Sequence, residues 1–120
     1  MSIAANAVIA LIALLHVWFL ILEMFLWTRP SGRRAFGTTA EFALQSKALA
    51  ANQGLYNGFL AAGLVWGLYL GAGGAGFSVK LFFLTCVLVA GIFGGLTASR
   101  KILWIQALPA LVALVLIHLP

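Results

Sequence analysis

The chain has 120 residues, of which 64% are hydrophobic and 8% charged, and its mean hydropathy is +1.14. Because soluble domains carry about 25% charged residues, this composition excludes a water-soluble globule. The formal net charge of +5 comes from basic residues beside apolar stretches. That placement is typical of membrane topology signals, so no nucleic-acid partner is expected.

Four long apolar stretches predict four transmembrane helices, at residues 3–27, 39–70, 79–98 and 102–119. Each is near or above the ~20 residues that cross a bilayer. We therefore expect an all-α polytopic four-helix bundle that forms a single transmembrane domain over residues 1–120. No Lys or Arg precedes the first stretch, which favours a retained helix over a cleavable signal.

The second predicted helix is longer than the hydrocarbon core, at about 48 Å. Thr38 and Glu41 fit a capping box at its start. We expect the stretch from Glu41 to Lys47 to lie in or along the cytoplasmic headgroups. A solvated helix start is favoured over a lipid sensor, because the stretch holds only these two charges.

The positive-inside rule sets the expected topology. Four of the seven basic residues lie in the first loop, two in the turn before the last helix, and one, Lys80, in the remaining turn. The first loop and the last turn are therefore predicted to be cytoplasmic, with both chain ends extracytoplasmic. The basic residues of the two cytoplasmic segments are Arg29, Arg33, Arg34 and Lys47, then Arg100 and Lys101.

Small residues recur at four-residue spacing, which lets transmembrane helices approach closely. Packing within one subunit explains such faces, but two of them on the second helix favour a homo-oligomer. The faces are Ala50/Gly54/Gly58/Ala62, Gly63/Gly67/Gly71 and Gly91/Gly95. Residues 71–76 also satisfy G-x-G-x-x-G, but without a preceding strand we interpret them as a flexible external turn.

Polar residues within the predicted spans are the candidates for function. Glu23 is the only acid among them, and His16 and Trp27 lie on its stripe of the first helix. Two interpretations remain open: these groups join helices, or they form a pocket facing the cytoplasmic leaflet that binds a head group or moves a proton. His16 alone is more typical of a neutral core residue. The candidate ligand-binding residues are Glu23, Asn52, Gln53, Asn57, Gln106, His16 and Arg100.

The sequence predicts no metal site and assigns no catalytic residue. One intramembrane Glu is too few for a di-iron bundle, and His118 is expected at the external end, far from Glu23. Cys86 is interpreted as a small apolar residue. Whether the protein is an enzyme is left open.

Three runs carry a resemblance over nearly the whole chain: residues 22–27 (LEMFLW), Phe36-Gly37, and residues 50–63 (AANQGLYNGFLAAG). They resemble the bacterial membrane family called domain of unknown function 1304, which implies a bacterial plasma (inner) membrane protein.

Residues 100–111 (RKILWIQALPAL) and the order of elements are also, more distantly, similar to the MAPEG enzymes. That likeness implies trimers of four-helix subunits with glutathione between them, Asn52 matching the Asn of their second helix and Arg100 lying near a functional basic position. The Arg and Glu that flank that Asn are absent here, which counts against glutathione transferase activity.

These observations favour a membrane protein that binds or acts on a lipophilic or amphipathic small molecule near the cytoplasmic face. The alternatives are a small oligomeric proton-coupled transporter and a structural subunit of a membrane complex. Binding is preferred because the polar groups concentrate in one half of the bilayer, whereas a transport path needs them throughout its depth.

Overall fold

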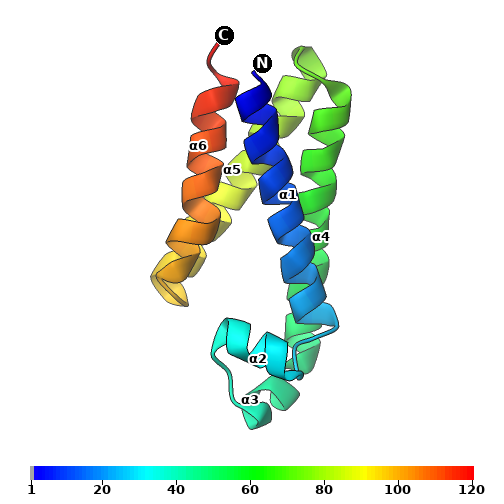
Figure 1. Ribbon diagram of the computed structural model, residues 1–120, viewed down its shortest axis with the longest axis vertical. Helices are drawn as coiled ribbons and strands as arrows, with labels where there is room; N and C mark the ends of the chain where they lie inside the picture. Colours follow the sequence, from blue (N-terminus) through cyan, green and yellow to red (C-terminus); the bar gives the residue numbers. More distant parts are fainter. Residues whose placement is uncertain (1) are drawn as a thin grey trace. The chain divides into compact units, whose positions relative to one another are not determined.

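The computed structural model describes residues 2–120, and every regular element in this range is a helix (Figure 1). The all-α class is therefore confirmed. Two helices, α1 and α5, are long and apolar enough to cross a membrane. The elements are α1 (Ile3–Met24), α2 (Pro30–Phe36), α3 (Ala40–Gln45), α4 (Lys47–Leu70), α5 (Gly74–Thr97), the π-helix η1 (Leu103–Ala107) and α6 (Leu108–Ile117).

The chain divides into two compact units, and α1 and α4 contribute to both. Unit 1 holds the chain up to Ala13 and from Leu60 to Pro120, and unit 2 holds Leu14–Phe59. Each unit is described by itself below. The single transmembrane domain expected from the sequence stays a prediction.

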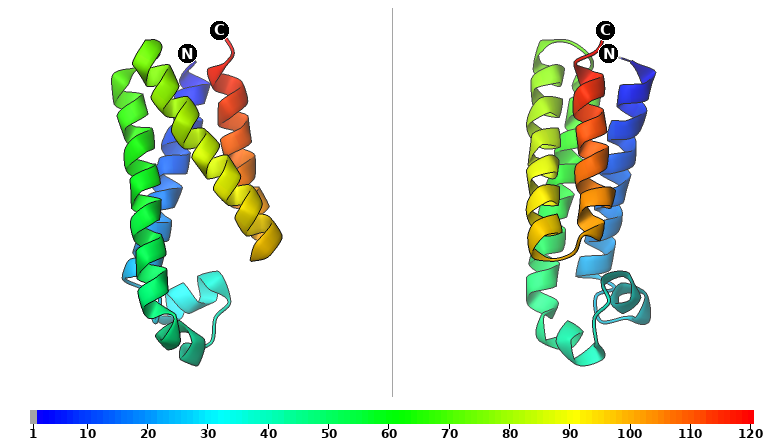
Figure 2. Two further views of the ribbon diagram at one scale, coloured as in Figure 1. Left: turned by 180° about the vertical axis from the view of Figure 1, so that it is seen from behind. Right: turned by 90° about the vertical axis from the view of Figure 1, so that its left-hand side faces the viewer.

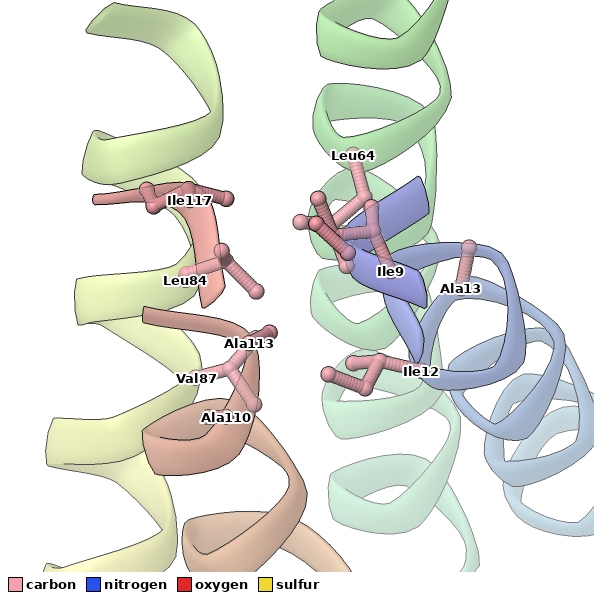
Figure 3. Packing of buried hydrophobic residues seen from close by; sticks show 10 residues of the cluster. Ile9, Ile12, Ala13, Leu64, Leu84, Val87, Ala110, Ala113 and Ile117 are labelled. Carbon is pink, nitrogen blue, oxygen red and sulfur yellow. The ribbon is translucent and has the colours of Figure 1, made fainter. Parts of the chain in front are cut away.

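Unit 1 is built around a dry apolar core (Figure 3). Ile9, Ile12 and Ala13 of α1 face Leu64 of α4, while α5 and α6 contribute the remaining side chains. Small alanines on α6 keep its backbone close to α5. The buried residues from α5 and α6 are Leu84, Val87, Ala110, Ala113 and Ile117.

The α5 glycines make the closest helix contact in unit 1. A Cβ built on Gly91 would lie 2.5 Å from the backbone nitrogen of Ala107, and one on Gly95 would lie 2.3 Å from Leu103 Cγ. At Gly91 only glycine fits against the backbone of η1, whereas a residue larger than glycine at position 95 would require the Leu103 side chain to move. The Gly91/Gly95 face predicted from the sequence is therefore used inside the chain, where α5 and α6 form an antiparallel hairpin (Figure 2).

The π-helix η1 has a local cause in the sequence. Pro109 follows it at the start of α6 and has no backbone N–H to donate to the preceding turn. The N–H of Leu108 reaches back to the carbonyl of Leu103, five residues earlier. The wider turn accommodates a proline that cannot donate the regular backbone hydrogen bond. Local π-turns are known to do this in helices.

Unit 2 pairs the second half of α1 with the first half of α4, and two short helices connect them. Gly54 and Gly58 let α4 approach α1, because Cβ atoms there would each lie 2.7 Å from a side-chain carbon, Met24 Cγ and Leu20 Cδ1 respectively. Helix α2 begins with Pro30 in its first turn and ends at Gly37, whose φ of 66° favours glycine.

Both small-residue faces of α4 are thus occupied within one chain. Gly54 and Gly58 contact α1, while Gly63 and Gly67 contact Phe83 and Lys80 of α5. The sequence argument for a homo-oligomer rested on an unused face. The homo-oligomer stays a prediction, but these faces no longer support it.

Several predicted boundaries differ from the structure, and the first helix ends at Met24 instead of residue 27. The helix predicted over 39–70 is interrupted at Ser46, so that α3 and α4 are separate. Its cap is Thr39, whose hydroxyl accepts from Phe42 N, and not Thr38. The third helix starts at Gly74, so only part of the glycine segment is a turn.

Candidate functional site

A buried carboxyl–amide pair lies in unit 2. The Nδ2 of Asn57 donates a hydrogen bond of 2.5 Å to Oε1 of Glu23, and the two residues are 7% and 8% exposed. They come from α4 and from the last turn of α1. Because a buried acid is costly unless a hydrogen-bond donor meets it, this pairing is the arrangement that physical chemistry favours.

The position of Asn57 depends on the glycine one turn before it. A Cβ on Gly54 would lie only 3.1 Å from Glu23 Cβ, so glycine brings the backbone of α4 directly against the acid. Asn57, three residues further along α4, then lies on the same face. Gly54 and Asn57 therefore act together, one providing space and the other the hydrogen bond.

The surroundings of Glu23 are apolar. Leu22 beside it is buried, and Leu20 and Met24 fill the contact with α4. Asn57 donates to one carboxylate oxygen, and a carboxylate has about four acceptor positions on its two oxygens. The pair therefore has acceptor capacity for a donor group beyond Asn57.

The other candidate residues occupy different environments. His16 is 0% exposed and meets the ring of Phe19 edge-on at 5.3 Å. Asn52 and Gln53 lie on the exposed side of α4, so neither shares the burial of Asn57. In unit 1, Gln106 is half-buried in η1, and Arg100 is exposed in the turn before η1.

Lys80 has a role that the sequence did not reveal. It was interpreted as a topological charge in an external turn, but it lies within α5 and is 1% exposed. Its Nζ donates to the carbonyl of Gly71 at 3.1 Å and to Oδ1 of Asn6 at 3.5 Å. Gly67 makes room for its stem, since a Cβ there would lie 2.7 Å from Lys80 Cγ.

A second polar contact in unit 2 fixes the loop helices. The indole Nε1 of Trp27 donates to Ser46 Oγ at 3.0 Å, and Ser46 Oγ donates to the carbonyl of Phe42 at 2.7 Å. Trp27 also packs on Phe36, with ring centroids 4.9 Å apart. Trp27 therefore holds α2 and the junction between α3 and α4 together.

A shallow apolar groove runs along one face of α5. Its only hydroxyl, on Thr85, donates to the carbonyl of Leu81 at 2.6 Å and is therefore used within the helix. Such a face is typical of contact with lipid or another apolar surface. The groove is lined by Phe82, Thr85, Cys86, Val89, Ala90 and Phe93.

These features define an all-helical protein with two helices able to cross a membrane and a buried acid–amide pair. Residues 10–118 match the family described as protein of unknown function DUF1304, and the chain belongs to this family. It is 30% identical over 117 residues to the uncharacterised protein YpaA of Lactococcus lactis, covering 96% of this chain and 97% of that protein.

No solved structure matches the chain. The family match confirms the resemblance drawn from residues 22–27 and 50–63. The more distant likeness to MAPEG enzymes finds no support in these matches.

Proposed function

We propose that the chain is a small polytopic membrane protein that binds a lipophilic or amphipathic small molecule at Glu23 and Asn57. The observation that carries this proposal is the Glu23 carboxyl group, enclosed among apolar side chains with the Asn57 amide on one oxygen. Ionisable groups within membrane spans are rare and mark functional sites by default, and Glu23 is buried in the last turn of α1.

The chemistry of the pair limits the ligand. A carboxyl group accepts from amines and other hydrogen-bond donors, and the apolar surroundings suit a hydrocarbon chain. An amphipathic amine fits both. Glutathione fits less well: Glu23 could accept from its ammonium group, but the pair offers no cation for its two carboxylates.

The membrane arrangement belongs to the same proposal. We place α1, α4, α5 and the continuous η1–α6 segment as four spans of a bacterial plasma (inner) membrane, with both termini extracytoplasmic. Six of the chain's seven basic residues lie in the first loop and the last turn, which supports this topology. The relative YpaA comes from a bacterium, which agrees with the bacterial part of this location. The homotrimer is favoured by the MAPEG likeness alone.

The test compares two probes of equal chain length, dodecylamine and dodecanol, on purified full-length protein in mild detergent. We expect dodecylamine to raise the unfolding temperature of the wild type more than dodecanol does. Glu23→Gln keeps the size of the side chain and its hydrogen bonding, so it should fold normally yet lose the amine response.

The matched control is Asn52→Ala, an exposed amide on the same helix as Asn57, which should respond like the wild type. An equal amine response in Glu23→Gln and wild type would contradict the proposal. Native mass spectrometry of the same samples reports any retained molecule and the number of subunits. A strictly monomeric mass in detergents and nanodiscs would remove the trimer.

Proton-coupled transport is a second candidate, favoured by one observation. His16 and Glu23 are two buried titratable groups on the same helix within unit 2. A relay would need both. If the protein transports, a gradient of the lipophilic cation tetraphenylphosphonium should drive proton movement in proteoliposomes, read by an internal pH dye, and Glu23→Gln should abolish it. Equal proton movement with empty vesicles would exclude this function.

A further inference from the structure

The loop between α1 and α4 carries an uncompensated positive charge. Arg29, Arg34 and Lys47 are exposed and Arg33 is half-buried, while Glu41 is the only acid from Thr28 to Lys47. Within the described residues, none of the four cationic side chains forms an ion pair with Glu41. We call Arg29, Arg33, Arg34 and Lys47 the basic surface.

Large apolar side chains are also exposed in the unit that carries the basic surface. Phe42, Leu44 and Leu49 are 53%, 69% and 76% exposed. They belong to α3 and the first turn of α4 and lie within the same unit as the basic residues. Cationic and apolar groups exposed together are typical of a segment in the interfacial layer of a membrane, where both kinds of group are satisfied.

The loop is held in a defined position, unlike a solvated linker. Trp27 bonds to Ser46 and packs on Phe36, as described above. Gly32 lies so close to the end of α1 that a Cβ there would be 2.0 Å from the carbonyl oxygen of Leu26. Helix α2 is therefore fixed against the end of α1, at the level where tryptophan side chains prefer the membrane–water boundary.

The hydrogen bonding of Arg33 also bears on what the basic surface binds. Its Nε is enclosed by the protein and has no hydrogen-bond acceptor within the described chain. Because Nε is enclosed, only the two terminal nitrogens of the guanidinium are left to meet an external oxyanion. A guanidinium pairs well with phosphate because its planar donors match two phosphate oxygens.

We propose that the basic surface, with Phe42, Leu44 and Leu49, binds the anionic phospholipid headgroups of the leaflet that it meets. The cations contact lipid phosphates, and the three apolar side chains enter the upper acyl region. The sequence favoured a solvated helix start here; the exposed apolar side chains and the fixed loop change that preference. The inference rests on the proposed membrane location and not on ligand binding at Glu23.

The test uses full-length protein with Trp27 as the sole tryptophan, after Trp18, Trp66 and Trp104 are changed to Phe. It is reconstituted into equimolar phosphatidylglycerol and phosphatidylcholine, with one or the other lipid brominated. Since each Lys or Arg near an anionic surface strengthens binding about fivefold, brominated phosphatidylglycerol should quench Trp27 clearly more than brominated phosphatidylcholine. Arg33→Gln with Arg34→Gln should bring the two values together.

The matched control is Arg100→Gln with Lys101→Gln, which removes two exposed cations elsewhere and should keep the preference. Equal quenching by both lipids in the parent protein, or equal loss in the two double variants, would overturn the inference. Loss of the preference on adding millimolar inorganic phosphate at constant ionic strength would assign the surface to free anions and also overturn it.

Two measurements keep the outcome decisive. If the single-tryptophan protein does not fold, native mass spectrometry of the unmodified protein and the same double variants counts retained phosphatidylglycerol, with the same expected order. If neither brominated lipid quenches Trp27, the membrane location in the proposed function fails. Equal quenching by both leaves that location standing and defeats only the inference.

Discussion

At the scale of single residues, a buried acid and a buried lysine distinguish this chain from a uniform apolar bundle. Glu23 is met by an amide and Lys80 by a backbone carbonyl. Each arrangement depends on a glycine in the facing helix, Gly54 for Glu23 and Gly67 for Lys80. At both Glu23 and Lys80, a glycine in the facing helix therefore makes room for the buried polar side chain.

Replacing Glu23 by leucine should lower stability. The change leaves the Asn57 amide buried without its acceptor, and an unpaired buried donor costs about 1–3 kcal/mol, less in a membrane where such bonds average ~0.6 kcal/mol. Thermal unfolding followed by circular dichroism in mild detergent would measure the loss. Glu23→Gln should unfold within a degree or so of the wild type, because it can still accept from Asn57. Equal unfolding temperatures for the wild type, Glu23→Leu and Glu23→Gln would show that the hydrogen bond between Glu23 and Asn57 does not stabilise the protein.

Replacing Lys80 by methionine should also destabilise the protein. Methionine keeps most of the side-chain volume but removes the donor to Gly71, whose carbonyl lies just beyond the last turn of α4, where a cation is favourable. We expect a loss of about 1 kcal/mol. The control is Lys101→Met, since Lys101 is exposed. If the two variants melt together, the buried lysine does not stabilise the turn between α4 and α5.

At the scale of the helices, close packing depends on where glycine allows a backbone to approach. Gly91 contacts the backbone of Ala107 in η1, and Pro109 produces the π-turn that presents this backbone. The wide turn of η1 therefore lies against the position on α5 where Gly91 has no side chain. The hairpin of α5 with η1 and α6 therefore has little tolerance for added volume.

Gly91→Ala should destabilise this hairpin by about 1–3 kcal/mol, because the new Cβ would lie 2.5 Å from a backbone nitrogen that cannot move alone. The matched control is Gly94→Ala in the same helix, where the new methyl group would meet only the side chain of Ile102, at 3.2 Å. Thermal unfolding of both variants separates packing from any general effect of the Gly→Ala change. A wild-type melting curve for Gly91→Ala would rule out the tight contact.

The helices themselves could be predicted from apolar length, but several of their details could not. The break at Ser46 coincides with a hydrogen bond from Trp27, nineteen residues earlier, which no local pattern reveals. Among the amides of α4, the sequence ranked Asn52 and Gln53 with Glu23. Only the rotation of α4 against α1, set by Gly54, selects Asn57 instead. Such choices are made by tertiary packing and not by periodicity.

At the scale of the whole chain, the proposed membrane arrangement has a definite orientation. The start of α1 and the end of α6 lie at the same end of unit 1 (Figures 1 and 2). This agrees with an even number of crossings. The charge pattern then chooses the side, since cationic loops are retained in the cytoplasm.

We therefore expect both ends of the chain to be extracytoplasmic and the loop around Arg33 and the turn at Arg100 to be cytoplasmic. Single cysteines at Ser2, Ser31 and Ser99, in a Cys86→Ser background, can be probed in intact cells with a membrane-impermeant maleimide. Ser2→Cys should react from outside, whereas Ser31→Cys and Ser99→Cys should react only after the cells are opened. Because four basic residues in one loop and two in one turn act together, a single Arg33→Gln change should not reverse this pattern. Labelling of Ser31→Cys from outside would invert the topology and would place the basic surface against the opposite leaflet.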